Sequence, residues 1–359
     1  MESGIMVKLH HKILPFILLF SFISPIFVSA ENTEIVVGPY LQSVDEEGIT
    51  IMWRTNVKTE ENTVFWGKTM ELENEIAGES NVEWHEVRIE GLEPSTHYFY
   101  KVKSDGAESK IYSFYIPPTD NFTFLVYGDT RGVWDGWRNA SIVAKAIEKE
   151  NASIVSHAGD IVRNGGNEEQ WLKFFQISSW MHNKSMYPAV GNHDLPIYNF
   201  ALFFSLPGNE RWYSFDYGNI HFTFLDSNRL QNLSQFLWLI KDLSTESKWK
   251  VVIFHHPPLI SGNYYPPPMI KIWMLIFYLA GVDVVFAGHQ HYYQHLKAGN
   301  MHCIITGGGG APPEDAGRSP WNIFSASAFH YCKVMVTEEE MRIVSIDVEG
   351  DVLEDFVIS

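Results

Sequence analysis

The sequence predicts an α/β protein in which a small N-terminal β-sandwich precedes a larger layered α/β domain. Between residues 34 and 116, short segments of alternating apolar and polar residues are separated by turn residues, which is typical of a β-sandwich. After Asn121 the pattern changes to strands that alternate with helical segments. The chain has 359 residues, of which 45% are hydrophobic, and this is enough to fill two cores.

The first thirty residues have the organisation of a secretory signal. Two lysines precede a mostly apolar stretch over residues 13–28, and Ala30 follows as a cleavage site. We therefore predict a signal peptide over residues 1–30, a secreted or extracytoplasmic location, and no stable membrane span after signal removal. The alternative is an uncleaved anchor, for which a stretch of about 16 residues is short.

The β-sandwich is predicted over residues 31–116. Its expected strands are the segments 35–42, 48–55, 62–67, 84–92, 97–103 and 110–116. No helical segment stands between them. The sequence PPTDN over residues 117–121 then breaks the alternation with prolines and polar residues, which indicates a linker.

The layered domain is predicted over residues 122–359, with helices near residues 139–150, 168–181, 233–243 and 269–280. Its closing segments are mostly strands, so we expect a mixed and double sheet system. The segment Ile272–Ala280 is apolar on all sides but too short to cross a bilayer. We interpret it as a buried helix; the alternative is an exposed apolar patch for self-association.

Charge and cysteine content limit the possible partners. The formal net charge of −17 argues against a general affinity for nucleic acid or anionic lipid, because a polyanion would be repelled. Any anionic substrate therefore needs a local positive centre. Cys303 and Cys332 both stand in strand-like segments, and whether they pair is left open.

Potential metal ligands stand at the ends of five predicted strands. They are Asp129, Asp160, Asn192 with His193, His255, and His289 with His291. The carboxyl ends of strands in open α/β sheets converge on one crevice, so we expect these side chains to meet. Nitrogen and oxygen ligands without a thiolate suit two divalent or trivalent cations. Each motif alone would be an ordinary turn or histidine; their joint occurrence predicts a metal centre.

The order of these motifs, GD, GD, GNHD, V-x-x-H and GHxH, resembles that of the calcineurin-like metallophosphoesterases. The segment GLEPSTHYFYKV resembles the corner of fibronectin type III domains, and GPYLQ and ITIMWRT precede it. With these segments the chain resembles the purple acid phosphatases from Val37 onward. The resemblance implies a fibronectin type III-like sandwich followed by an α/β/β/α metallophosphoesterase domain.

The resemblance also implies a role for each ligand. Asp160 would bridge two metal ions. Asp129 and His291 would complete the first metal site, while Asn192, His255 and His289 would hold the second metal ion. His193 would face the leaving-group oxygen as a proton donor or transition-state stabiliser.

The function implied is an exported dinuclear-metal hydrolase, acid phosphatase-like, that cleaves small-molecule phosphomonoesters by attack of a metal-bound hydroxide. His256, Arg131 and Arg163 are candidate phosphate contacts; alternatively they are surface residues near the mouth of the site. Two other functions are kept: a phosphodiesterase or nucleotide hydrolase on the same metals, and a catalytically weak cell-surface binding protein. The oligomeric state stays open.

Two arginines depart from the family pattern. Arg163 stands where the purple acid phosphatases have an iron-ligating tyrosine, and Arg131 stands where the wider superfamily often has a histidine. Neither guanidinium can act as a ligand. We therefore expect two divalent ions of Mn, Fe or Zn, with weaker binding at the first position, no iron(III)-tyrosinate, and a pH optimum nearer neutral than acid.

Overall fold

The computed structural model describes residues 32–262 and 264–359. The predicted signal peptide lies outside these residues. Contacts between Cα atoms join Thr33–Ser359 into one unit. Among the residues described, no helix has the length and apolar character needed to span a membrane.

Two β-sheets packed face to face form the centre of the fold. The larger has nine strands, in the spatial order β21 (Val352–Ile358), β20 (Met341–Asp347), β19 (His330–Val336), β9 (Phe122–Tyr127), β10 (Ile154–His157), β11 (Ser185–Pro188), β1 (Ile35–Gln42), β2 (Gly48–Thr59) and β5 (Val82–Glu90). The second has seven strands, in the order β12 (Tyr213–Tyr217), β13 (Ile220–Leu225), β14 (Trp249–Phe254), β15 (Val284–Ala287), β17 (Met301–Thr306), β16 (Tyr293–Ala298) and β18 (Asn322–Ala326). Phe124 of one sheet meets Phe222 of the other edge to face, with ring centroids 5.0 Å apart.

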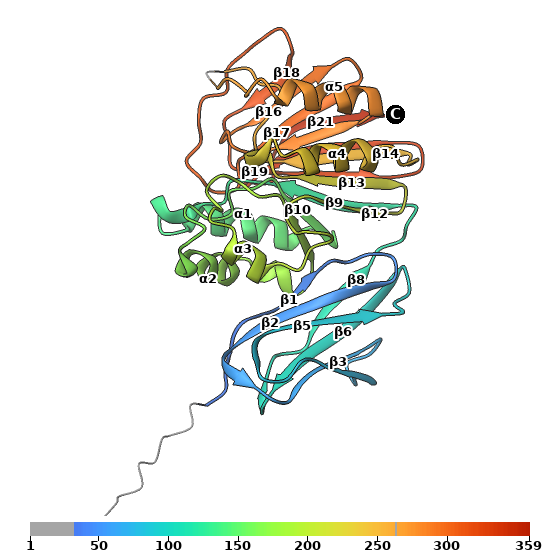
Figure 1. Cartoon of the computed structure of the whole chain (residues 1–359), viewed down its shortest axis with the longest axis vertical. Coiled ribbons are helices and arrows are strands. Elements are labelled where there is room, and N and C mark those ends of the chain that lie inside the picture. The colour runs from blue at the N-terminus through green and yellow to red at the C-terminus, as the bar shows by residue number, and fades with distance from the viewer. Residues whose placement is uncertain (1–31, 263) are drawn as a thin grey trace, which may run out of the picture. The chain divides into compact units, whose positions relative to one another are not determined.

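Helices cover the outer faces of the two sheets, which produces α/β/β/α layers (Figure 1). The helices are α1 (Arg138–Lys149), α2 (Glu168–Ile177), α3 (Tyr198–Phe203), α4 (Leu233–Asp242) and α5 (Ile270–Ala280), with short 3-10 turns η1 (Gly132–Trp134), η2 (Ser179–His182) and η3 (Ser227–Arg229). Buried Val143 of α1 shares a core with Val155 of the nine-stranded sheet. Trp273 of α5 packs against Phe254 of the seven-stranded sheet. The predicted fold class is confirmed.

Short polar side chains and one glycine set the helix ends. Asn167 accepts a hydrogen bond from the backbone N–H of Gln170 at 3.3 Å and starts α2. Asn232 does the same for α4. Gly281, with φ of 70°, ends α5 in the left-handed conformation. Three predicted helices begin and end within one residue of the prediction. The exception is α2, which ends at Ile177 and not at residue 181, because Ser178 leaves the helical conformation and the 3-10 turn η2 follows. The sequence did not predict α3.

The N-terminal sandwich shares a sheet with the layered part of the chain. Its second sheet contains β4 (Asn74–Ala77), β3 (Asn62–Gly67), β6 (Thr96–Ser104) and β7 (Ala107–Glu108), and β8 (Tyr112–Ile116) pairs with β6. Its first sheet continues into the nine-stranded sheet, because Leu41 of β1 pairs with Ser185 of β11 in parallel. The division at residues 31–116, 117–121 and 122–359 stays a prediction.

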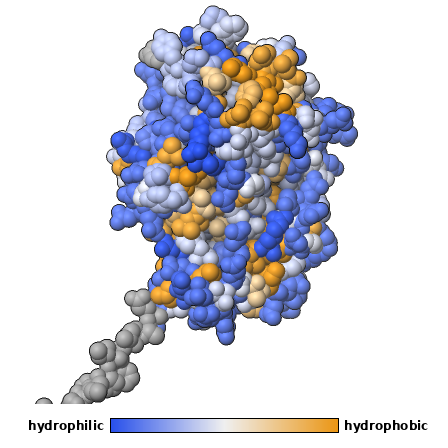
Figure 2. Space-filling model, in the orientation of Figure 1, coloured by the Kyte–Doolittle hydropathy of each residue, from blue (hydrophilic) through white to orange (hydrophobic). Residues whose placement is uncertain are grey.

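Helix α5 is buried on one face only. Trp273 and Phe277 are fully buried, whereas Leu275 is 57% and Leu279 is 75% exposed. Figure 2 shows an apolar patch in the region where α5 lies in Figure 1. The interpretation of this segment as a buried helix therefore applies to its inner face, and its outer face is an exposed apolar surface.

The two cysteines are free thiols. Cys303 lies on β17 and Cys332 on β19, both buried and in different sheets. Burial raises the pKa of each thiol to about 12. Neither is suited to act as a thiolate nucleophile or metal ligand at neutral pH.

Tyrosine hydroxyls connect the N-terminal strands to the layered part of the chain. Tyr40 donates to the carbonyl of Phe203 at 2.6 Å, and Tyr187 donates to that of Val44 at 2.5 Å. We expect Tyr40→Phe to lower the free energy of unfolding by about 1–2 kcal/mol, because a buried carbonyl loses its donor. Tyr265→Phe, at a residue that is 87% exposed, serves as control. Equal urea midpoints for both variants would contradict this expectation.

Candidate metal centre

The loops that follow β9, β10, β11, β14 and β15 bring the predicted ligands together. Asp129 and Asp160 both have φ of 59°, a left-handed conformation that turns each chain sharply after its strand. The loops approach closely because Gly191 has no side chain: a Cβ there would lie 2.1 Å from the backbone nitrogen of Asp160. The expected convergence of strand ends is thus present, and it involves strands from both sheets.

In both Asp129 and Asp160, one carboxylate oxygen accepts a backbone hydrogen bond and the other does not. Asp129 Oδ2 accepts the backbone N–H of His289 at 2.7 Å, and Asp160 Oδ1 accepts that of His193 at 2.8 Å. The other oxygens, Asp129 Oδ1 and Asp160 Oδ2, are buried and have no hydrogen-bond partner. Two carboxylate oxygens at nearly zero exposure need a cation close by, and the guanidinium of Arg131 lies 3.8 Å from the first and 3.4 Å from the second.

The ligands assigned to the second metal ion form a compact set. The Oδ1 atom of Asn192 lies 3.1 Å from Nε2 of His255 and 3.2 Å from Nδ1 of His289, and the two histidine nitrogens are 3.2 Å apart. Asp160 Oδ2 is 3.3 Å from the same His255 nitrogen. Ligands bound to one ion at about 2.0–2.2 Å are separated by about 3.0–3.4 Å. The donor atoms of Asn192, His255 and His289 therefore have the spacing of ligands to one divalent cation, and Asp160 Oδ2 lies beside His255.

The orientation and charge of His255 agree with this fit. Its Nδ1 donates to the carbonyl of Ala158 at 2.9 Å, which directs Nε2 toward the centre. Burial lowers the pKa of His255, but the charges of Asp160 and Asp129 outweigh burial and raise it to about 9. The two carboxylates thus favour a positive charge at the position of His255.

The ligands assigned to the first metal ion surround Arg131. Its Nη1 lies 3.4 Å from Asp160 Oδ2 and its Nη2 lies 3.8 Å from Asp129 Oδ1. The same guanidinium contacts Nε2 of His291, whose Nδ1 donates to the carbonyl of Pro312 at 2.9 Å. Arg131 is only 6% exposed. It lies among the ligands and not at the mouth, where a phosphate contact was expected.

Three further predicted residues lie around this centre. His193 Nδ1 donates to the carbonyl of Arg163 at 2.8 Å, and the Arg163 side chain is exposed and lies over the ring of Trp134 at 4.7 Å. The ring of His256 lies 4.6 Å from that of His289, and its Nδ1 hydrogen-bonds Ser227. His256 also lines a surface cleft of about 640 Å³ with the segment 227–232. His256 therefore connects the candidate ligand His289 with this surface cleft.

Asp194 is a residue to which the sequence assigned no role. Its carboxylate accepts the backbone N–H groups of Asp160, Ile161, Val162 and Gly191 at 2.8 to 3.2 Å. Burial and the charge of Asp160 raise its pKa to about 7, while these donors favour the ionised form. In the sequence, Asp194 is the last residue of the GNHD motif. An acidic residue next to a ligand motif can bind the backbone N–H groups of a neighbouring loop, and this could have suggested its role.

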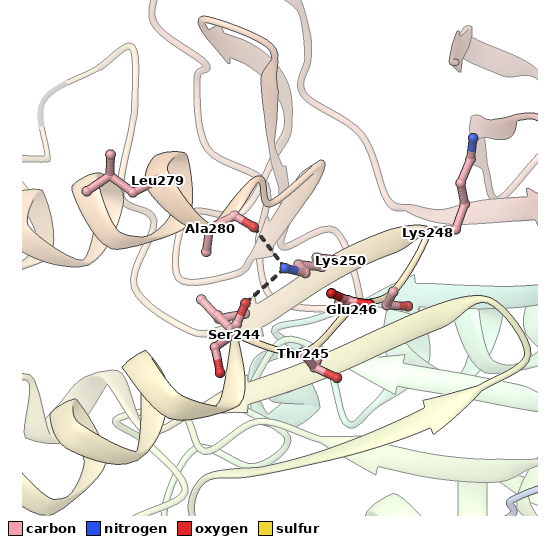
Figure 3. A pocket seen from close by; sticks show the side chains of 9 residues that line it. Ser244, Thr245, Glu246, Lys248, Lys250, Leu279 and Ala280 are labelled. Carbon is pink, nitrogen blue, oxygen red and sulfur yellow. Dashed lines mark hydrogen bonds between the residues drawn. The ribbon is translucent and has the colours of Figure 1, made fainter.

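A second pocket lies at the C-terminal ends of α4 and α5 (Figure 3). Its Lys250 donates to the carbonyls of Leu243 and Ala280, both at 2.9 Å. The ammonium group is occupied by helix-terminal carbonyls. Lys248, the other lysine of the lining, is exposed and lies over the ring of Trp249 at 5.2 Å. None of the predicted ligands lines this pocket.

The layered sheets and the converging oxygen and nitrogen donors define a metallophosphoesterase-like fold, and comparison with known proteins agrees. The family model for the calcineurin-like phosphoesterases matches residues 122–293, and that for the purple acid phosphatase N-terminal domain matches residues 37–116. The chain thus contains, in this order, an N-terminal domain similar to that of the purple acid phosphatases and a domain similar to the calcineurin-like phosphoesterases.

Curated relatives include purple acid phosphatase 18 of Arabidopsis thaliana, 26% identical over 285 residues, which are 68% of this chain and 63% of that protein. Fe(3+)-Zn(2+) purple acid phosphatase 12 of the same plant is 24% identical over 70% of this chain and 62% of its own length. The chain thus spans less than two thirds of these relatives. The solved purple acid phosphatase PPD1 of yellow lupin has the same fold, with a TM-score of 0.77 at 19% identity, covering 89% of this chain and 74% of that one.

We expect Asp194→Asn to destabilise the fold by about 2–4 kcal/mol, because an amide group would face backbone donors and leave some of them unpaired. Asp315→Asn, at an exposed position, is the matched control. Thermal unfolding of both variants measures the difference. A melting temperature of the Asp194 variant equal to that of the control would contradict the role of Asp194.

Proposed function

We propose that the protein is an exported, metal-dependent phosphomonoesterase of the acid phosphatase type. The observation that carries the proposal is the cluster of donor atoms around His255. Its Nε2 lies 3.1 to 3.3 Å from Asn192 Oδ1, His289 Nδ1 and Asp160 Oδ2. This set lies beside an open cleft and next to a histidine suited to proton transfer. A secreted or extracytoplasmic location is part of the same proposal.

A cation at this position would supply positive charge for the phosphoryl oxygens and acidify a water molecule. The residues of the chain then have separate tasks. Asp160, Asn192, His255 and His289 would hold the cation. Mn, Fe and Zn all accept this mixture of carboxylate, amide and imidazole ligands. A pair of ions is what the family resemblance implies, and here the first position shares its donors with Arg131.

His193 is suited to deliver a proton to the leaving group. Its Nδ1 donates to the carbonyl of Arg163, so this nitrogen keeps its hydrogen and Nε2 is the atom that exchanges a proton. Its backbone N–H is bound to Asp160, which fixes the ring beside the centre. The exposed guanidinium of Arg163 and the ring of His256 are the outer contacts proposed for the phosphate.

We expect His193→Ala to lower kcat on a nitrophenyl monoester by about 10²–10⁴-fold with unchanged metal content, because only proton transfer is removed. Asp160→Asn should lose metal and activity together. His97→Ala, at an exposed histidine on β6, is the control and should keep both. Full activity of the His193 variant would contradict its assignment.

Two alternative functions are separated by simple measurements. A phosphodiesterase or nucleotide hydrolase would turn over the bis-nitrophenyl ester or a nucleotide faster than the monoester. A surface-binding protein would take up metal and hydrolyse none of these substrates. We expect the monoester to be preferred.

The iron-loaded protein is expected to lack an intense visible absorption band, because position 163 is arginine and offers no phenolate for charge transfer to iron(III). Absorption spectra of protein reconstituted with iron in air would test this. An intense band near the tyrosinate transition would show that another tyrosine ligates the metal.

A further inference from the structure

The guanidinium of Arg131 lies where the ligands assigned to the first metal ion converge. It is within 3.4 Å of Asp160 Oδ2 and 3.8 Å of Asp129 Oδ1, and it contacts His291 Nε2. These three atoms are the protein ligands implied for that ion. Arginine keeps its proton under all physiological conditions and has no lone pair to offer, so it competes with a metal for these ligands and cannot join them.

Several contacts hold the guanidinium in this place. The backbone N–H of Arg131 donates to the carbonyl of Ile161 at 3.2 Å, which ties the loop after β9 to the loop after β10. The ring of Trp134 lies 5.3 Å from the guanidinium carbon, a cation–π distance. Gly132 permits this tight turn, since a Cβ there would lie 2.7 Å from the Cα of Trp137.

His291 is oriented to receive the guanidinium. Its Nδ1 donates to the carbonyl of Pro312 at 2.9 Å, so Nε2 of the neutral ring carries the lone pair. Arg131 donates to this lone pair. The second position is arranged differently. Its donor atoms from Asn192, His255 and His289 are an amide oxygen and imidazole nitrogens, and the guanidinium of Arg131 approaches only the Asp160 oxygen that the two positions share.

We propose that Arg131 takes the place of the first metal ion and that each chain binds one divalent cation, at Asp160, Asn192, His255 and His289. This inference rests on the metal site of the proposed function but not on the activity. The fixed charge of Arg131 balances the carboxylates that two ions would otherwise share. A second divalent ion would have to displace a buried cation that already occupies its ligands.

The full chain, purified and treated with a chelator, is titrated with Mn²⁺, and bound metal is counted by elemental analysis and by electron paramagnetic resonance. We expect one equivalent per chain and the spectrum of an isolated Mn²⁺ ion. Two equivalents with an exchange-coupled spectrum would overturn the proposal. His289→Ala tests the same point: we expect no tightly bound metal, and one remaining equivalent would overturn the assignment to a single site.

Arg131→His restores the imidazole that the wider superfamily often has at this position, and we expect it to bind two equivalents. A folded Arg131→His protein that still binds one would overturn the role of Arg131. Arg163→Ala is the matched control, because its guanidinium contacts the same Trp134 from an exposed position, and it should stay at one equivalent. If the wild-type chain binds one metal and hydrolyses no ester, the proposed activity fails while this inference stands.

Discussion

The burial of two carboxylates, Asp129 and Asp160, is the constraint that the rest of the centre meets. An ionised carboxylate at nearly zero exposure is costly unless charges and hydrogen bonds compensate it. Each uses one oxygen to hold the backbone of another ligand loop and directs the other oxygen inward. Arg131 and the raised pKa of His255 are responses to this negative charge. The metal ion proposed for the second position would further compensate the same charge.

Close approach of the loops makes this concentration of charge possible. Gly191 and Gly288 stand where a Cβ would lie 2.2 Å and 2.5 Å from the carboxylate oxygens of Asp160 and Asp129 respectively. Asp194 then binds the backbone of both neighbouring loops through four N–H groups. The separations of 3.1 to 3.3 Å between donor atoms at the second position therefore depend on how closely the backbone loops pack, as well as on the ligand side chains.

Much of the fold and the convergence of the candidate ligands could be predicted because the signals are local. An apolar run that ends at glycine and a ligand, such as the one before Asp160, marks a strand and its functional end in nine residues. The pairing of Leu41 with Ser185 could not be predicted, since it joins strands 144 positions apart without a pattern of its own. The direction of the Arg131 side chain could not be predicted either, because a long side chain can point to solvent or to the interior. Here its packing against Trp134 selects the inward direction.

Trp134 also explains how two separate departures from the family pattern act together. Its ring is 46% exposed and lies near both guanidinium groups, at 5.3 Å from Arg131 and 4.7 Å from Arg163. One cation is buried among the carboxylates and the other is exposed, so positive charge extends from the centre to the surface. The net charge of −17 acts only over a Debye length of about 8 Å in physiological salt. For the phosphate ester proposed as substrate, these two cations therefore outweigh the more distant acidic groups, which is how an acidic chain can attract an anion.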